Sequence, residues 1–314
     1  MKVLIFGAGG VGSVVGGFLA RTGHEVSLLG RPWHVEAIRK NGQAIKGIWG
    51  DYRIKAFDLY TTIAEVENSG TSFDLIILTV KSFDTQEAVK QLAPLMKPHT
   101  MLLSLQNGLG NIEAILEKVS PEQFLAGRII FGVETEPGVA KVTVNADSVY
   151  IGPGVEGSTP KLSAYQMAAI LNTAKIPSQG VPDILPYIWS KVIYNCALNA
   201  ICTIHEIPYG KILENDDTRE MMKSIVRECY AVGTQKGVVL SPASAEEYID
   251  LLVGKLIPRT AAHFPSMLQD VRRGKKIDID SLNGAIVRLG RETKTPTLAN
   301  ESVIQSLVSL GVSA

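Results

Sequence analysis

The sequence predicts an α/β domain followed by an all-helical domain, and two observations support this prediction. Up to about residue 180, short apolar runs alternate with amphipathic segments, which is typical of a mainly parallel sheet with helices on both faces. Beyond that point helical periodicity continues with almost no strand signal. We therefore expect domains over residues 1–182 and 183–314, because a chain of 314 residues can bury two cores.

The first element is a strand–turn–helix unit. Lys2–Phe6 is a short apolar strand, and three glycines follow it at the spacing of a phosphate-binding loop. Gly7 permits a tight turn, Gly9 lets the backbone approach a pyrophosphate, and Gly12 lets helix and strand pack closely. The amides and the positive dipole at the helix start would hold phosphate. This unit predicts a Rossmann-type dinucleotide-binding domain.

The second strand, Glu25–Leu29, indicates which dinucleotide binds. An NAD-binding protein usually places an acidic residue at the end of this strand, where it accepts hydrogen bonds from the ribose hydroxyls. Here Gly30 carries no charge and Arg31 can pair with a 2′-phosphate. We therefore expect NADPH rather than NADH.

Two other interpretations of this segment remain open. Residues 3–20 are uncharged and follow Lys2, which also fits a signal peptide or membrane span. The glycine cluster and the polar sequence of residues 20–25 argue against a span. A glycine turn without a cofactor is the second alternative, although strand, loop, helix and strand occur in the expected order.

The later elements of the first domain follow the same alternation. We expect helices over residues 84–95 and from the 152–160 loop to about residue 175, and strands over residues 73–80, 100–105, 124–133, 140–144, 148–151 and 176–181. The later strands are close enough in sequence to pair antiparallel.

Helical periodicity defines the second domain. It covers residues 187–205, 217–237, 243–263, 266–273, 280–293 and 297–310. A dinucleotide domain followed by a helical domain would leave a cleft in which a small substrate meets the nicotinamide. The apolar carboxyl-terminal helices fit either a homodimer interface or a buried core.

Composition excludes several classes of protein. The 31 basic and 31 acidic residues give no net charge, so nothing favours nucleic acid or an anionic membrane as a partner. Cys196, Cys202 and Cys229 lack zinc-site spacing, and the histidines form no metal-ligand pair. We expect no metal, three reduced and buried thiols, and a cytoplasmic protein.

A polar stripe marks the first helix of the second domain. Lys191, Asn195 and Asn199 are four residues apart on a helix that is otherwise apolar, so they share one face. Such groups are costly in a buried helix unless a polar ligand satisfies them. The alternative is a solvated Lys191 with both asparagines bonded to nearby backbone.

Three motifs resemble those of the ketopantoate reductases (2-dehydropantoate 2-reductases). The resemblance runs from the first strand to the last helices. The family's Trp-x-Lys-x-x-x-Asn-x-x-x-Asn motif is met from Trp189 to Asn199, and Gln106-Asn107-Gly108 follows a strand. The third motif is Ser-Met-Leu-Gln-Asp at 266–270 with Ile-Asp-x-x-Asn-Gly at 279–284.

The resemblance implies roles for the matching residues on the substrate. Lys191 would be the general acid and stabilise the developing alkoxide of a 2-oxo acid. Asn195 and Asn199 would bind substrate hydroxyl or carboxylate oxygens, and Ser266 the carboxylate. Ser266 with Gln269 also fits a helix capping box.

The resemblance also implies roles at the cofactor. Asn107 would lie between nicotinamide and substrate, and Lys81, after a strand, would contact NADPH beside Arg31. Each residue also has a simpler interpretation. Asn107-Gly108 is a common turn pair, and Lys81 after its strand fits a solvated side chain.

Two departures from the family pattern concern the substrate. Asp278 stands where the family usually has a Glu that binds the substrate hydroxyl and assists the lysine, so its reach is one methylene shorter. His263 and Pro265 replace a common Asn and Ser. Asp278 would alternatively be an exposed charge at a helix start.

The function implied by the resemblance is NADPH-dependent reduction of 2-dehydropantoate to (R)-pantoate, a step in pantothenate and coenzyme A biosynthesis. One alternative is a reductase of the same family that acts on another 2-oxo acid. A non-catalytic NADP-binding sensor is another.

Overall fold

The structure is a computed structural model that describes residues 1–311, and its contacts divide the chain into two units. The first comprises Met1–Asn107 and Asn111–Ile184. The second begins at Leu185 and also takes in Gly108–Gly110, a short piece from within the first unit's sequence. The sequence placed the boundary between residues 182 and 183.

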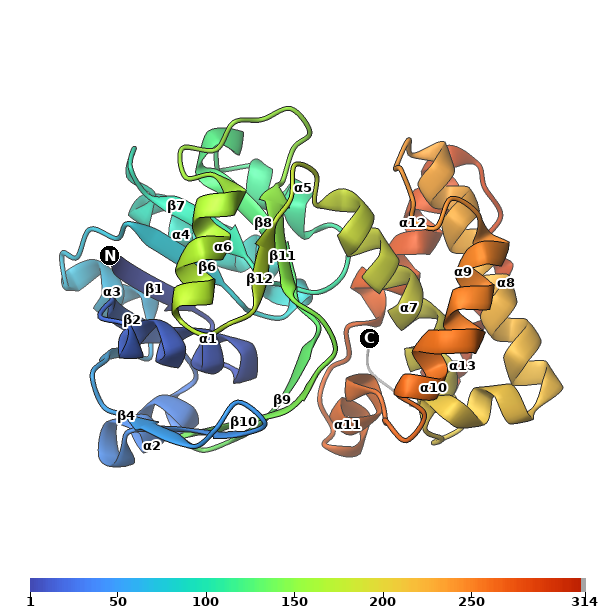
Figure 1. Cartoon of the computed structure of the whole chain (residues 1–314), viewed down its shortest axis with the longest axis horizontal. Helices are drawn as coiled ribbons and strands as arrows, with labels where there is room; N and C mark the ends of the chain where they lie inside the picture. Colours follow the sequence, from blue (N-terminus) through green and yellow to red (C-terminus); the bar gives the residue numbers. More distant parts are fainter. Residues whose placement is uncertain (312–314) are drawn as a thin grey trace. The chain divides into compact units, whose positions relative to one another are not determined.

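An eight-stranded sheet forms the centre of the first unit (Figure 1). In sheet order its strands are β12 (Ser178–Gly180), β11 (Val149–Pro153), β8 (Phe124–Arg128), β7 (Met101–Ser104), β6 (Leu75–Leu78), β1 (Lys2–Phe6), β2 (Glu25–Leu29) and β5 (Asp58–Tyr60). Only the β8–β11 pairing is antiparallel. The mainly parallel sheet and the antiparallel later pair are as expected.

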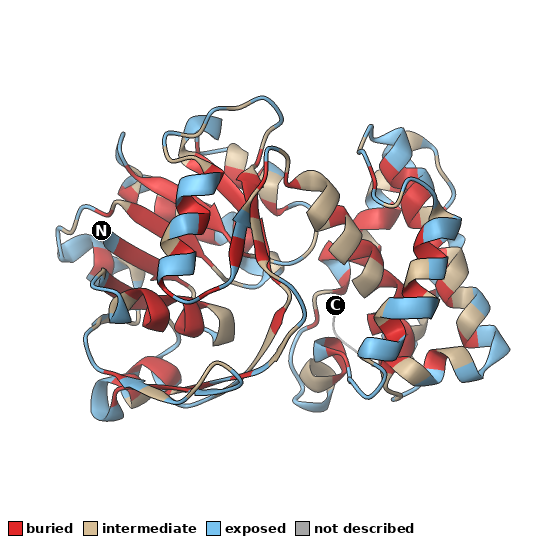
Figure 2. Ribbon diagram, viewed as in Figure 1, coloured by how far each residue is buried: buried red, intermediate tan, exposed pale blue. Residues whose placement is uncertain are grey.

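Apolar runs explain why the central strands are buried. Every residue of β6, β7 and β8 is buried, and Figure 2 colours the central strands of the sheet red. Strands covered on both faces need side chains that are apolar on both sides. The helices of this unit are α1 (Gly10–Arg21), α2 (Pro32–Asn41), α3 (Ile63–Asn68), α4 (Thr85–Leu92), α5 (Asn111–Leu116) and α6 (Ala164–Thr173).

A second, four-stranded sheet was not expected. Its order is β4 (Tyr52–Ile54), β3 (Gln43–Gly47), β10 (Val139–Asn145) and β9 (Phe131–Glu136). The strand expected at 124–133 is wrong as one element, because the chain leaves the main sheet after β8 and enters the second sheet as β9. Both halves are apolar, so the sequence pattern does not mark the change of sheet.

Helices make up the second unit, and no strand occurs in its described residues. They are α7 (Leu185–Ile204), α8 (Asp216–Gln235), α9 (Ala245–Leu251), α10 (Ile257–Arg259), α11 (Ser266–Arg272), α12 (Asn283–Thr293) and α13 (Leu298–Ser309). Short 3₁₀ turns at Tyr209–Glu214 and Ile279–Ser281 connect them, and Leu252–Leu256 is a π-helical turn. The all-helical class is confirmed.

The three cysteines are free thiols in the core of this unit. Burial raises the pKa of Cys202 to about 12, because a thiolate would lose its hydration there. They therefore act as small apolar packing groups, as the sequence indicated.

The membrane-span interpretation of residues 3–20 is wrong. That segment folds as β1, a glycine turn and α1. Among residues 1–311, no helix has the length and apolarity needed to cross a bilayer.

Candidate active site

Four neighbouring strands bring the proposed cofactor residues to one edge of the main sheet. Strands β7, β6, β1 and β2 are adjacent and parallel, so their carboxyl ends lie together. Asn107 follows β7 and Lys81 follows β6, while the glycine loop follows β1 and Arg31 follows β2. The chain continues from β1 to β2 on one side and later adds β6 on the other, and ligands bind at such a switch point in open α/β sheets.

The glycines of the loop are required by its geometry. Gly7 has a φ of +107°, which a residue with a side chain rarely adopts. A Cβ on Gly12 would lie 2.5 Å from the Gly7 carbonyl oxygen and 2.8 Å from Ile5. A Cβ on Gly9 would have only one protein atom within 4 Å. The loop is therefore tight at Gly7 and Gly12 and open at Gly9, the position expected to face a pyrophosphate.

The start of α1 is suited to an anion. Gly9 precedes this helix and no side chain caps its first amides. Such amides and the helix dipole attract negative charge. The amides of Gly7 and Ala8, which precede the helix, donate to the Leu29 carbonyl at 3.0 and 2.8 Å. These bonds fix the turn against the end of β2.

Arg31 occupies the cap position of α2. It is exposed, and the first turn of α2 contains no acidic residue. A Cβ on the preceding Gly30 would lie 2.9 Å from the Ala8 side chain, so the backbone here passes close to the glycine loop. Arg31 thus starts a helix next to the loop, and no carboxylate of that first turn would repel a 2′-phosphate.

Hydrogen bonds join the loops that carry Lys81 and Asn107. The Ser82 hydroxyl donates to the Asn107 carbonyl at 2.6 Å, and Gln106 Nε2 donates to the Val80 carbonyl at 3.1 Å. Asn107 is exposed. Gly108 has a φ of +86°, a conformation that glycine adopts easily and that is common in turns.

The polar stripe of α7 runs from half-buried to buried. Lys191 and Asn195 are half-buried, whereas Asn199 is 5% exposed. The Tyr209 hydroxyl donates to Asn199 Oδ1 at 2.8 Å. Burial raises the pKa of Tyr209 well above its usual value, so the hydroxyl stays protonated and donates. Asn199 is therefore held by a side chain, not by nearby backbone as the simpler alternative expected, and its amide NH₂ is oriented.

Sequence reasoning missed Tyr209, which is separated from α7 by a turn and carries no motif signal. The Tyr209 amide donates to the His263 carbonyl at 3.0 Å, and the Gly210 amide donates to the Ala261 carbonyl at 2.9 Å. These bonds join the 3₁₀ turn that follows α7 to the segment that leads into Ser266.

Ser266 is the first residue of α11, which packs against α7. The capping-box alternative is wrong, because Pro265 holds the cap position and no side chain caps this helix. Ser266 is exposed. Within the second unit, its helix is thus brought next to the stripe helix.

Asp278 precedes the 3₁₀ turn at Ile279–Ser281. It holds the cap position of this turn and is half-buried, so it lies at a helix start as the alternative expected, but it is not an exposed charge. Asn283, the Asn of the same motif, is fully buried and donates to the Cys196 carbonyl at 3.2 Å and to Asn300 Oδ1 at 2.9 Å. That residue fixes the start of α12 against α7 and α13.

The packing of the Gly108–Gly110 segment explains why residue 108 is a glycine. The Leu109 amide donates to the Ser281 carbonyl at 2.8 Å, and a Cβ on Gly108 would lie 2.5 Å from Ser281 Oγ. Gly108 and Leu109 therefore pack within the second unit against Ser281 of the Ile-Asp-x-x-Asn-Gly motif.

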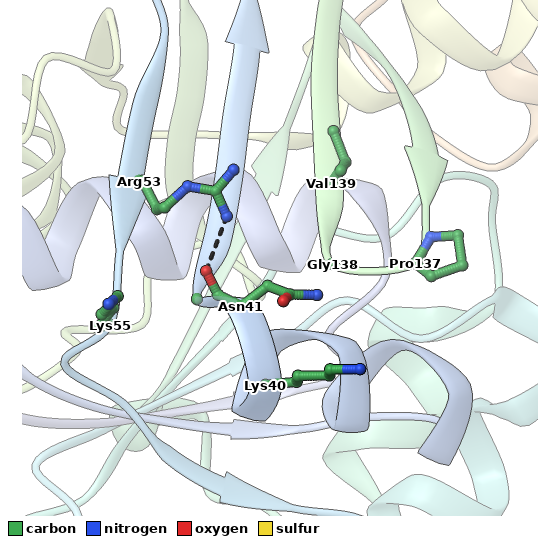
Figure 3. A pocket seen from close by; sticks show the side chains of 8 residues that line it. Lys40, Asn41, Arg53, Lys55, Pro137, Gly138 and Val139 are labelled. Atoms are coloured by element: carbon green, nitrogen blue, oxygen red, sulfur yellow. Dashed lines mark hydrogen bonds between the residues drawn. The ribbon is translucent and has the colours of Figure 1, made fainter.

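Two surface hollows lie away from these residues, beside α2. One of about 480 Å³ lies at the carboxyl end of α2, where Figure 3 shows Arg53 bonded to the Asn41 carbonyl near Lys40 and Lys55. Its basic residues complement the negative end of the α2 dipole.

In the described part of the chain, no three His, Cys, Asp or Glu side chains lie close enough to hold a metal ion.

Comparisons with known proteins match both units. The family model for ketopantoate reductase PanE/ApbA matches residues 3–156, and the model for its C-terminal domain matches residues 183–310. The chain is 38% identical to the 2-dehydropantoate 2-reductase of Aquifex aeolicus over 304 residues, which is 96% of this chain and 94% of that protein.

Solved structures agree with this. A PanE/ApbA family ketopantoate reductase from Ralstonia eutropha JMP134 is 32% identical with a TM-score of 0.86, covering 99% of this chain and 98% of that one. D-mandelate dehydrogenase in a ternary structure with NADH and anilino(oxo)acetate is 27% identical with a TM-score of 0.86, covering 99% of this chain and 100% of the other.

Proposed function

The chain belongs to the ketopantoate reductase PanE/ApbA family, and on this premise we propose that it reduces 2-dehydropantoate to (R)-pantoate with NADPH. This reaction is a step in pantothenate and coenzyme A biosynthesis. The observation that carries the proposal is the stripe of one ammonium and two amides on α7, with Asn199 oriented by Tyr209.

The chemistry assigned to this chain is proton transfer and charge stabilisation. When bound, the reduced nicotinamide supplies the hydride that reaches the 2-oxo carbon. Lys191 gives a proton to the oxygen of that carbon, and its positive charge stabilises the alkoxide character that the oxygen develops. A half-buried ammonium is effective here, because fewer water molecules compete for the oxygen.

Substrate oxygens are assigned to neutral and acidic groups of the second unit. The free amide NH₂ of Asn199 and the side chain of Asn195 donate to hydroxyl or carboxylate oxygens. Ser266 binds the carboxylate at the start of α11. Asp278 accepts from a substrate hydroxyl and assists Lys191, at the shorter reach of an aspartate.

Cofactor binding is assigned to the edge residues of the first unit. The glycine loop and the start of α1 hold the pyrophosphate. Arg31 pairs with the 2′-phosphate, Lys81 contacts NADPH beside Arg31, and Asn107 lies between nicotinamide and substrate. The loop fits such a group, because Gly9 leaves space and no side chain caps the α1 amides.

The Arg31→Ala variant tests the choice of NADPH. Losing the guanidinium removes a charge-assisted bond to the 2′-phosphate, so we expect the NADPH dissociation constant to rise about tenfold or more. The NADH constant should change little. Calorimetric titration with both cofactors measures this, and equal losses would show that Arg31 does not read the 2′-phosphate.

The reaction itself is tested by following NADPH oxidation with purified protein. We expect turnover with 2-dehydropantoate and formation of (R)-pantoate. Absence of turnover with 2-dehydropantoate, together with turnover of another 2-oxo acid, contradicts the substrate.

A second candidate is a reductase of another 2-oxo acid. Two observations favour it: Asp278 is shorter than the usual glutamate, and D-mandelate dehydrogenase shares the fold at 27% identity. A panel of branched, hydroxylated and aromatic 2-oxo acids, each with NADPH and NADH, separates the candidates. Tight NADPH binding without turnover on any of them would indicate a sensor.

For assembly we propose a homodimer. Leu298 and Val308 of α13 are 72% and 58% exposed, and α13 belongs to the apolar carboxyl-terminal helices. Light scattering should give about twice the 33.9 kDa mass of one chain. A mass of one chain at micromolar concentration contradicts the proposal.

A further inference from the structure

His34 is a buried histidine to which the proposed reaction assigns no role. It is the third residue of α2 and is 1% exposed. Arg31, at the cap of the same helix, is exposed only three residues earlier. A polar ring this deeply buried is costly unless both of its nitrogens are hydrogen-bonded.

One ring nitrogen contacts the helix that follows the glycine loop. His34 Nε2 lies 2.9 Å from the hydroxyl oxygen of Ser13, which is fully buried. Ser13 comes directly after Gly12, and its amide donates to the Gly9 carbonyl at 2.9 Å as the first hydrogen bond of α1. The His34–Ser13 bond therefore ties α2 to the turn of α1 that carries the loop.

The other ring nitrogen contacts the turn between β9 and β10. The Gly138 amide nitrogen is 3.2 Å from His34 Nδ1, and the Glu136 carbonyl oxygen is also 3.2 Å from Nδ1. The amide can only donate and the carbonyl can only accept, so the ring tautomer decides which of the two bonds Nδ1 makes; in either tautomer the neutral ring bonds this turn through Nδ1 and the Ser13 hydroxyl through Nε2. Burial lowers the pKa of His34, in agreement with a neutral ring.

A further bond holds Ser13 from the opposite direction. Gln43 Nε2, on β3, donates to the Ser13 carbonyl at 2.6 Å, and Gln43 is fully buried. With its hydroxyl on His34 and its carbonyl on Gln43, Ser13 cannot shift without breaking a buried bond. His34 is thus anchored to a fixed point of α1.

We propose that His34 is a positioning residue for cofactor selectivity: through Ser13 and Gly138 it fixes the start of α2, and with it Arg31, relative to the glycine loop. The inference rests on the proposed role of Arg31 at the 2′-phosphate. The glycine loop binds the pyrophosphate common to both cofactors, whereas only the 2′-phosphate of NADPH depends on where α2 begins. A loosened α2 therefore weakens NADPH more than NADH.

The variants His34→Leu, Ser13→Ala and their combination test the bond. We expect each single variant to raise the NADPH dissociation constant about tenfold, the effect of one net hydrogen bond, and the NADH constant less than about twofold. The double variant should be no weaker than His34→Leu, because the two side chains act through one bond. His34→Gln, which keeps both a donor and an acceptor near Ser13, should recover much of the affinity.

His99→Leu is the matched control. His99 Nε2 also lies beside a serine hydroxyl, that of Ser72 at 3.2 Å, but this pair is exposed and precedes strands β6 and β7 instead of following them. We expect no change for either cofactor. Thermal melts of all variants, followed by circular dichroism, identify any that fail to fold. If His34→Leu fails to fold, Ser13→Ala still tests the bond, because it removes only one oxygen atom.

The outcomes separate this inference from the proposal on which it rests. Equal affinity of the unaltered protein for NADPH and NADH overturns the proposed cofactor itself. If the unaltered protein prefers NADPH, equal losses for both cofactors, or no loss in His34→Leu and Ser13→Ala, overturn only the role of His34. A selective, non-additive loss supports it.

Discussion

Lys191 is the residue on which the proposed chemistry depends most. Replacing it with alanine removes the proton donor and the charge but leaves the residues assigned to the cofactor in place. We expect kcat to fall about 10²- to 10⁴-fold while the NADPH dissociation constant stays nearly unchanged. Steady-state kinetics and calorimetry measure the two quantities.

Lys223→Ala is the control for that prediction. Lys223 lies on α8 of the same unit and pairs with Glu220 at 2.7 Å. Its loss should leave kcat unaltered within about twofold, because an exposed ion pair contributes little. A mild effect of Lys191→Ala, similar to this control, would remove Lys191 from the acid role.

The lowered pKa of His34 predicts how the free energy of unfolding depends on pH. Burial holds its pKa in the folded protein below the ordinary histidine value of 6.5, so the unfolded chain binds this proton more readily. Stability from His34 is therefore full above about pH 6.5 and falls as pH decreases below it, by at most about 1.4 kcal/mol per pH unit.

Urea unfolding between pH 5 and 7 measures this slope. His34→Gln should give a shallower dependence than the unaltered protein. His24, whose pKa is also lowered by burial, is present in both proteins and so cancels in the comparison. Identical slopes would mean that His34 is protonated equally in the folded and unfolded states.

Individual residues show where sequence reasoning was sufficient and where it was not. The four-residue spacing placed Lys191, Asn195 and Asn199 on one helix, since α-helical geometry is local. The partner of Asn199 was not predictable, because Tyr209 reaches it only after the chain turns back at the end of α7.

The glycine loop has no room for an added side chain at Gly12. In Gly12→Ala, the added Cβ would lie within 2.8 Å of Gly7, Thr79 and Ile5, so strand and helix must separate. We expect the free energy of unfolding to fall by about 1–3 kcal/mol, the usual cost of overpacking, and NADPH affinity to fall with it.

Gly254→Ala is the matched substitution for this prediction. A Cβ there has no atom within 4 Å, and its φ is not positive. Stability should stay within about 1 kcal/mol of the unaltered protein. Equal urea midpoints for both variants would contradict the packing role of Gly12.

Other elements differ in how far their patterns specified them. β2 and the helices of the second unit follow from apolar runs and periodicity that extend over whole elements. β3, β4 and β5 are only three to five residues long and were not predicted. These strands lack the continuous apolar run of β2 and carry few alternating positions, so their pairing partners specify them: β3 pairs with β10, β4 with β3, and β5 with β2.

For the whole molecule, cofactor binding should raise stability. A ligand that binds only the folded state stabilises it by about 2.7 kcal/mol at one hundred times its dissociation constant. NADPH should therefore raise the melting temperature more than the same concentration of NADH, and Arg31→Ala should remove most of the difference. Equal shifts in the unaltered protein would contradict the preference for NADPH.

The sequence by itself determined the two fold classes, the glycine loop, the stripe of α7 and the family. These depend on spacing within one element, or on motifs that are read along the chain. The tertiary structure alone decided that the strand expected at 124–133 divides between two sheets, that Tyr209 orients Asn199, and that His34 joins α1 to the β9–β10 turn. His34 meets Ser13 and Gly138 across 21 and 104 residues of chain, and no local pattern encodes contacts at such separations.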